Sequence, residues 1–345
     1  MIDEVMMLRH GRTQYNLEHR LQGQIDVPLD IVGQWQVDQT GFALASRYYW
    51  AKVNRLASHP EAIAQPGPDA AERTDIHQYE EAPAAGRRMV VLTSDLFRAQ
   101  QTAHAFADVL GLPVVCDRRL RERSFGEWEG LTRAEIKAVA AEDYASWKHH
   151  TGGETKHGVE SRAEVGKRGA DAVRALVCDS AYADDTPTTL MLVTHGSWIT
   201  ATIANLLDLD PDGMNALGAM RNACWCRLKV RHSVNGQSTE QPLWELEEYN
   251  KAPAIADCAD WENGPADLRG PHMPGWQHKP RGRPPRPGLP ADCVVSGYVS
   301  RHIRMAQPHI GCWRGDMEHS MNAFAANSNG RFRLFSVWNR TAIEQ

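Results

Sequence analysis

The residues best suited to chemistry stand together near the start of the chain, directly after a short apolar run at residues 5–8. Arg9 is a permanent cation whose planar set of donors matches the oxygens of a phosphate group. His10 offers a ring nitrogen that can act as a nucleophile or a base near neutral pH. Gly11 lets the backbone turn sharply, and Asn16 can donate an amide hydrogen bond to the same anion. Taken alone, the stretch could equally be a surface turn with a chance Arg-His pair.

Two later apolar runs also end in polar residues. The run at 89–92 leads to Arg98 after a short polar turn, and the run at 189–193 ends just before His195. The carboxyl ends of parallel strands meet at one edge of a sheet, where open α/β folds bind ligands. We therefore expect Arg98 and His195 to lie beside His10. A lone histidine after a buried strand is more often a core residue. Because three apolar runs end in polar residues in the same way, we instead expect His195 to belong to a ligand-binding site.

A loop at residues 120–130 supplies the carboxylate that such a site needs. Phosphoryl transfer requires positive charge around the phosphate oxygens, a nucleophile in line with the leaving oxygen, and an acid that protonates the leaving alkoxide. The loop holds several carboxylates that could act as this acid, among them Glu122, Glu127 and Glu129. The sequence has no GxxxxGK[ST] loop and no Asp pair at magnesium-binding spacing, so we expect neither a metal nor another cofactor.

Five segments in this order resemble the histidine phosphatase superfamily, whose fold is phosphoglycerate mutase-like: LRHGRTQYN, TSDLFRAQQTA, LRERSFGEWEG, GVESRAEVGKR and LVTHGSW. The resemblance covers residues 3–207 and implies that His10 becomes a phosphohistidine and that Glu122 is the general acid. The implied catalytic residues are His10, Glu122 and His195. The implied phosphate-binding residues are Arg9, Asn16, Arg98 and His195. Ser161 and Arg168 match a helix-opening segment, to which we assign a structural role.

The sequence does not assign a catalytic role to several other polar residues near these motifs. Arg12 is either a further phosphate contact or a surface charge. His149, His150 and His157 lie in a loop that we expect near the substrate, and we interpret them as solvated residues.

The elements that must hold the site follow from apolar runs alternating with helical patterns. An imperfect helical pattern extends from residue 32 to residue 50, and capping boxes beginning at Thr132 and Ser161 each predict a helix start. Residues 223–230 and 242–249 are interpreted as a hairpin of strands. This alternation predicts an α/β fold with a parallel-rich sheet and helices on both faces. The family resemblance implies a three-layer α/β/α sandwich.

We divide the chain into three parts. Residues 1–250 form the catalytic domain, with an inserted surface loop at residues 57–86 that holds four prolines. Residues 251–290 are rich in Pro and Gly, which predicts an extended, solvated linker. Residues 291–345 regain apolar content and form an appendage to which we assign no role.

Composition limits the partners. The formal net charge is −5, and the excess of positive charge lies after residue 250, so the acidic main body argues against nucleic-acid binding. We find no apolar run long enough to cross a bilayer and no secretory signal. The seven scattered cysteines are typical of reduced thiols. We expect a cytoplasmic protein whose partner is a small phosphorylated substrate, with no membrane partner.

Phosphomonoester hydrolysis is the activity we expect. The segment around Glu122 reads Arg-Glu-Arg-Ser-Phe-Gly, whereas proteins that resemble the glycolytic mutase carry an Asn-Glu-Arg-x-Tyr-Gly type of segment. This difference favours the phosphatase branch over the first alternative, a cofactor-dependent phosphoglycerate mutase. A non-catalytic phospho-ligand binding or regulatory protein is the second alternative, although a binder needs neither a nucleophile nor an acid.

Overall fold

The computed structural model describes residues 1–62, 86–210, 217–234, 237–269, 323–326 and 332–335. The chain divides into two compact units, Met1–Pro284 and Pro285–Gln345. In the second unit the described residues form an antiparallel pair of strands, β7 (Ala323–Ala326) and β8 (Phe332–Phe335).

The first unit is built on a six-stranded sheet with the strand order β3-β2-β4-β1-β5-β6. β1, β2, β3 and β4 pair in parallel, and the hairpin of β5 and β6 is antiparallel and pairs with β1 through β5. The strands are β1 (Ile2–Arg9), β2 (Arg88–Thr93), β3 (Val114–Cys116), β4 (Thr188–Thr194), β5 (Trp225–Val234) and β6 (Gln237–Lys251). The predicted mostly parallel sheet and the hairpin are confirmed.

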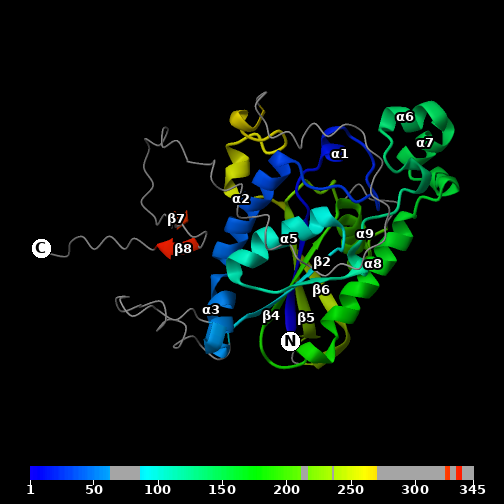
Figure 1. Cartoon of the computed structure of the whole chain (residues 1–345). Helices are drawn as coiled ribbons and strands as arrows, with labels where there is room; N and C mark the ends of the chain where they lie inside the picture. The colour runs from blue at the N-terminus through cyan, green and yellow to red at the C-terminus, as the bar shows by residue number, and fades with distance from the viewer. Residues whose placement is uncertain (63–85, 211–216, 235–236, 270–322, 327–331, 336–345) are drawn as a thin grey trace, which may run out of the picture. The chain divides into compact units, whose positions relative to one another are not determined.

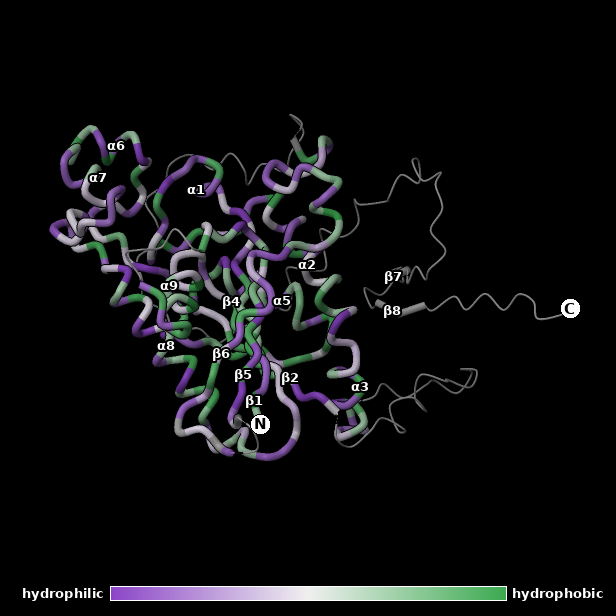
Figure 2. The backbone as a smooth tube through the Cα atoms, turned by 180° about the vertical axis from the view of Figure 1, so that it is seen from behind, coloured by the Kyte–Doolittle hydropathy of each residue, from purple (hydrophilic) through white to green (hydrophobic). Residues whose placement is uncertain are grey.

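Helices cover both faces of this sheet (Figure 1). One face carries α2 (Ile31–Arg47), α3 (Tyr49–Ser58) and α5 (Phe97–Leu110), and the other carries α8 (Arg162–Val177) and α9 (Gly196–Leu206). Successive β1 side chains alternate between the two cores: Val5 and Met7 pack with α8 and α9, while Met6 and Leu8 pack with α2 and α5. This burial on both faces explains why the central strands are continuous apolar runs. Figure 2 shows hydrophobic segments gathered where the sheet passes through this unit.

A small helical lobe projects beside the carboxyl ends of the parallel strands (Figure 1). It contains α6 (Arg133–Val139), α7 (Ala141–Lys148) and the 3-10 turn η4 (Gly153–His157), and it has an apolar cluster of its own around Trp128 and Ile136. Both predicted capping boxes are present, at the starts of α6 and α8. The remaining short elements are α1 (Gln14–Leu17), η1 (Pro60–Ala62), η2 (Arg118–Leu120), η3 (Gly126–Trp128), η5 (Ser180–Tyr182), η6 (Ala254–Asp257) and η7 (Ala266–Arg269). None of the described helices is long and apolar enough to cross a membrane.

Two observed boundaries differ slightly from the approximate ones expected from the sequence. The helical pattern after residue 31 breaks at Tyr48, whose hydroxyl donates a hydrogen bond to Glu4 of β1 at 2.7 Å. A second helix, α3, then continues to Ser58, so the inserted loop starts later than residue 57. Residues 63–85 of that loop lie outside the described residues.

The linker does not begin at residue 251. β6 ends at Lys251, and the segment that follows folds back on the first unit through Trp261, which is 2% exposed. Trp261 packs with Leu29 and Val37, because its indole buries a large apolar area there. The linker prediction rested on the Pro and Gly content of the segment and did not take this apolar side chain into account. Residues 270–290 of the expected linker, and the appendage apart from β7 and β8, lie outside the described residues.

Candidate active site

The site forms where β1 and β4 end side by side. Arg9 and Thr194 are paired in the parallel register, and the backbone N–H of His10 donates to Thr194 O at 3.0 Å. His10 and His195 follow these strand ends directly, so both histidines lie at one edge of the sheet. Both are buried, and their ring centroids are 5.2 Å apart. The juxtaposition that we predicted from two separate apolar runs is therefore present.

The protonation of His10 follows from one hydrogen bond. Its Nδ1 lies 2.7 Å from the carbonyl oxygen of Gly11. Because a carbonyl oxygen can only accept, Nδ1 carries the proton and Nε2 keeps its lone pair. Burial, followed by the positive charges of Arg98 and Arg9, lowers the pKa of His10 well below its usual value. His10 is therefore a neutral imidazole near pH 7, with Nε2 available for attack.

Arg9, Arg98 and His195 surround this ring with buried nitrogen atoms. Arg9 Nε, Arg98 Nε and both ring nitrogens of His195 make no hydrogen bond to any of the described residues. Buried donors of this kind are nearly always satisfied, so together they form a cradle suited to the oxygens of an anion. Burial lowers the pKa of Arg98 to about 10, which leaves it a cation at neutral pH. Burial and the charge of Arg98 also lower the pKa of His195 well below its usual value.

Arg98 is fixed by backbone atoms of the loop that follows α1. Its Nη1 donates to Ile25 O and its Nη2 to Gly23 O, each at 2.8 Å. Arg9 Nη1 donates to Met220 O in the turn before β5. Both guanidinium groups are thus held in place by backbone carbonyl oxygens, and within the described part of the chain neither forms an ion pair with a carboxylate, so their donors can serve a ligand.

Glu122 enters the site from the loop after η2 and lies at the N-terminus of α9. Its carboxylate accepts backbone hydrogen bonds from Arg123 (2.8 Å), Trp198 (3.0 Å) and Ser197 (3.2 Å). Its own carbonyl oxygen accepts from Arg168 Nη2 at 3.0 Å. These contacts place the carboxyl group against the cavity that His10 lines.

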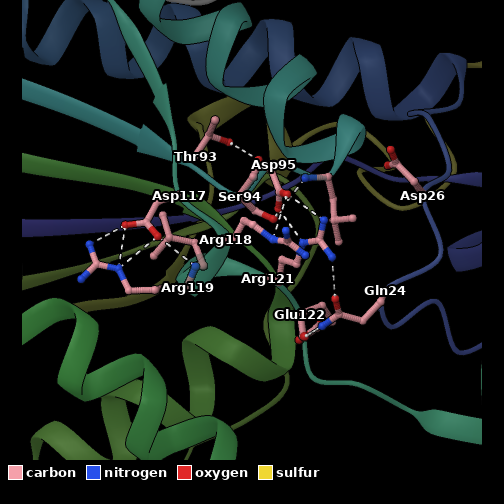
Figure 3. A network of polar contacts seen from close by, with 12 residues as sticks. Gln24, Asp26, Thr93, Ser94, Asp95, Asp117, Arg118, Arg119, Arg121 and Glu122 are labelled. Carbon is pink, nitrogen blue, oxygen red and sulfur yellow. Dashed lines mark hydrogen bonds and ion pairs between the residues drawn. The ribbon is translucent and has the colours of Figure 1, made fainter. Parts of the chain in front are cut away.

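A second set of contacts holds the Glu122 backbone from the other side (Figure 3). Gln24 Nε2 donates to Glu122 O at 2.9 Å, and Gln24 Oε1 accepts from Arg121 at 3.1 Å. Arg121 in turn forms a bidentate ion pair with Asp95, at 2.6 and 2.7 Å. The polar turn after β2 therefore positions the candidate acid.

Asn16 lines the same cavity. Its Oδ1 accepts from the backbone N–H of Thr13 at 3.2 Å and from Asn222 Nδ2 at 3.1 Å. Because these contacts occupy the oxygen, the amide nitrogen of Asn16 is the group that can donate to a ligand. All six predicted site residues are thus gathered around one cavity or, for His195, directly beside it.

The other loop carboxylates lie elsewhere. Glu127 is exposed and faces His157 at 3.3 Å, while Glu129 accepts from the backbone of Gln24 and Phe125. Neither lines the cavity, in contrast to Glu122.

Both interpretations of Arg12 are wrong. Its side chain is buried and pairs with Asp30 at 2.7 Å. His157 is not simply solvated, because it bonds Asp143 at 3.0 Å, and His150 lines the cavity and contacts Arg162 at 3.2 Å.

Several cavity residues escaped the sequence-based prediction. Besides five of the six predicted residues, the lining includes a group of basic side chains from the helical lobe and its neighbours: Arg20, Arg123, Arg133, Lys148, His150 and Arg162. They come from separate short elements, so no spacing in the sequence links them. The cavity, about 530 Å³, is larger than a phosphate group needs. In the described part of the chain, no group of three or more His, Cys, Asp or Glu side chains could hold a metal ion.

Comparisons with known sequences agree with this geometry. A family model described as the histidine phosphatase superfamily (branch 1) matches residues 5–61 and 71–238. The chain is 31% identical over 262 residues to a glucosyl-3-phosphoglycerate phosphatase from Mycolicibacterium vanbaalenii, covering 74% of this chain and 98% of that protein. It is 32% identical over 255 residues to the protein of the same name from Mycobacterium tuberculosis, with coverage of 73% and 96%.

Solved structures give the same result. The native mycobacterial glucosyl-3-phosphoglycerate phosphatase superposes with a TM-score of 0.51 at 30% identity, covering 72% of this chain and 99% of that one. Its complex with inorganic phosphate gives a TM-score of 0.52 at 30% identity, with coverage of 73% and 98%. The chain therefore belongs to the histidine phosphatase superfamily.

Proposed function

We propose that this phosphomonoester hydrolase acts through a covalent phosphohistidine at Nε2 of His10. The observation that carries the proposal is the hydrogen bond from His10 Nδ1 to Gly11 O, which leaves a neutral Nε2 among the cationic groups of Arg9 and Arg98. A neutral imidazole beside two fixed cations is a nucleophile placed next to the charge that attracts its substrate.

The first half-reaction forms the intermediate. Nε2 of His10 attacks phosphorus while Arg9, Arg98, His195 and the Asn16 amide hold the equatorial oxygens. The bond between phosphorus and the ester oxygen breaks, and the protonated carboxyl of Glu122 gives its proton to the leaving alkoxide.

The second half-reaction restores the enzyme. Glu122, now a carboxylate, takes a proton from water, and the resulting hydroxide attacks the phosphoryl group on His10. The phosphorus–nitrogen bond breaks, so phosphate leaves, Nε2 regains its lone pair and Glu122 is protonated again. One water is consumed per ester cleaved, and the protein ends unchanged.

The basic lining of the outer cavity supports a substrate with a second negative group. Arg133, Lys148 and Arg162 lie outside the set that holds the phosphate. We infer that they recognise a carboxylate, so that the substrate is a phosphorylated carboxylic acid. Glucosyl-3-phosphoglycerate, the substrate in the names of the two mycobacterial relatives, combines both groups with a sugar. It is the substrate we propose.

A phosphoglycerate mutase is the less supported alternative. One relative, from Yersinia enterocolitica, carries the name "Probable phosphoglycerate mutase GpmB" at 30% identity over 235 residues, covering 67% of this chain and 86% of that protein. The two activities differ in the acceptor of the phosphoryl group. Conversion of 3-phosphoglycerate to 2-phosphoglycerate, when primed with the bisphosphate, would favour the mutase.

The direct test uses p-nitrophenyl phosphate in the presence of EDTA, with the His10→Ala protein as blank. We expect turnover by the wild type and a loss of at least a thousandfold in the variant, because the nucleophile is gone. Turnover that is equal in both proteins, or lost in EDTA, would overturn the proposed mechanism.

A trapping experiment separates the enzyme from a non-catalytic phospho-ligand binder. After brief exposure to ³²P-labelled substrate and a quench in alkaline SDS, the wild type should carry phosphate on His10 that is stable in alkali and released by acid. The His10→Ala protein should carry none. A wild type without label but with measurable phosphate binding would point to a binding protein instead.

A further inference from the structure

The segment at residues 252–264, called the strap below, extends from β6 across the loop that follows β1. The family model ends its match at residue 238, so the strap lies outside the matched region. Its anchor is Trp261, which is 2% exposed and packs with Leu29, Val37 and Ala223. A buried indole of this size fixes the strap firmly against the elements around the nucleophile.

Backbone carbonyl oxygens of the strap accept hydrogen bonds from the side chains of Arg12, which follows the nucleophile closely, and Gln36 of α2. Glu262 O accepts from Arg12 Nη1 at 2.7 Å, and Trp261 O accepts from Gln36 Nε2 at 2.6 Å. Gln36 Oε1 in turn accepts from the backbone N–H of Arg12 at 2.9 Å. The loop that leaves the nucleophile is therefore bonded to the strap both directly and through α2.

The turn at residues 220–224 lies between the strap and the catalytic groups. Trp261 Nε1 donates to Asn222 O at 2.9 Å. The Asn222 side chain is buried, and its Nδ2 lies 3.1 Å from both His10 O and Asn16 Oδ1. The backbone N–H of Ala223 donates to His10 O at 3.1 Å as well. One side chain thus contacts the nucleophile's backbone and a phosphate-binding amide.

We propose that Asn222, held in place by Trp261, is a positioning residue for phosphoryl transfer. This inference rests on the proposed function. By donating to Asn16 Oδ1, Asn222 turns the Asn16 amide so that its Nδ2 faces the cavity. By donating to His10 O, it fixes the backbone from which the attacking ring projects. Small displacements of a nucleophile cost large factors in rate, so a residue without substrate contact can control turnover.

The test compares Asn222→Ala, Trp261→Phe and the double variant in the full chain. Phe keeps most of the apolar packing of Trp261 but lacks the Nε1 donor. We expect kcat for p-nitrophenyl phosphate to fall about tenfold in Asn222→Ala and severalfold in Trp261→Phe. Because Trp261 acts through Asn222, the double variant should lose no more than Asn222→Ala alone.

A matched control comes from the same strap. Glu262→Gln removes the charge of the exposed ion pair with Arg221 but keeps the backbone carbonyl oxygen that Arg12 uses, so its kcat should equal that of the wild type. Melting temperatures of all variants separate positioning from unfolding. Wild-type kcat in Asn222→Ala, losses that multiply in the double variant, or losses that match the unfolded fraction would each overturn the inference. Absence of wild-type turnover would instead overturn the proposed function.

Discussion

The carboxylate of Glu122 accepts a hydrogen bond from the backbone N–H of Trp198 at 3.0 Å. Trp198 lies in the first turn of α9, the helix that starts directly after His195. Backbone N–H groups in the first turn of a helix have no intrahelical partner and can bind a side-chain oxygen. One helix therefore positions the candidate acid relative to the phosphate-binding histidine, although the two residues are far apart in the sequence.

If Glu122 is the acid, the loss in Glu122→Gln should depend on the leaving group. An alkyl phosphate needs its leaving oxygen protonated, whereas p-nitrophenolate leaves without a proton. We expect kcat for an alkyl phosphomonoester to fall about a hundredfold or more, and kcat for p-nitrophenyl phosphate to fall much less. Steady-state rates with the two substrates measure this difference.

Glu127→Gln is the matched control for that experiment, because Glu127 belongs to the same loop but its exposed side chain lies outside the cavity. It should leave both rates unchanged. An equal loss with both substrates in Glu122→Gln would show that Glu122 holds the site together but does not donate the proton.

The pH dependence of the rate follows from the lowered pKa of His10. Since the ring stays neutral below pH 6.5, the acidic limb of kcat/KM should lie below that value. Arg98, with a pKa of about 10, stays charged across this range. An acidic limb that lies above pH 6.5 would contradict the role of His10 as a neutral nucleophile.

The two buried histidines should make the folded protein less stable as the pH falls below 6.5. The pKa values of His10 and His195 are lowered in the folded protein, so between those values and 6.5 the unfolded chain binds more protons. Stability from these groups is complete above pH 6.5 and is lost as the pH falls below it, by up to about 1.4 kcal/mol per pH unit for each. Thermal melts of wild type and His195→Gln between pH 7.5 and 5 measure it, and the variant should show a smaller loss.

His104 provides a control of opposite sign. Its hydrogen bond to Asp108 raises its pKa, so its contribution is present below pH 6.5 and is lost as the pH rises. His104→Gln should therefore not reduce the loss of stability on acidification. A reduction as large as that in His195→Gln would refute the assignment to the buried pair.

The basic lining of the cavity predicts a selective change in substrate affinity. Arg162→Gln should raise KM for glucosyl-3-phosphoglycerate about tenfold, since a charge-assisted hydrogen bond to the carboxylate is lost. KM for p-nitrophenyl phosphate, which has no carboxylate, should stay unchanged. Lys167→Gln on the same helix, whose exposed side chain pairs with Asp171, should affect neither substrate. Equal effects on both substrates would contradict carboxylate recognition.

The amino-acid sequence alone determines the strands, the helix starts and the fold class, because these features depend on residues that are close together along the chain. The apolar runs before His10 and His195 specify strands that are buried on both faces of the sheet. The capping boxes at Thr132 and Ser161 fix helix starts through contacts three residues apart. Fold class and the sheet edge that carries the site were predictable for this reason.

Tertiary structure decided which side chains complete the site. Glu122, Glu127 and Glu129 are chemically alike, so their residue type does not identify the acid. The contacts of Arg168 and Gln24 with the Glu122 backbone, and of Trp198 with its carboxylate, bring Glu122 to the cavity. The roles of Asn222 and Trp261 likewise depend on a hairpin that packs β5 against β1, more than two hundred residues after His10. Such contacts arise from packing between distant segments, and no spacing in the sequence encodes them.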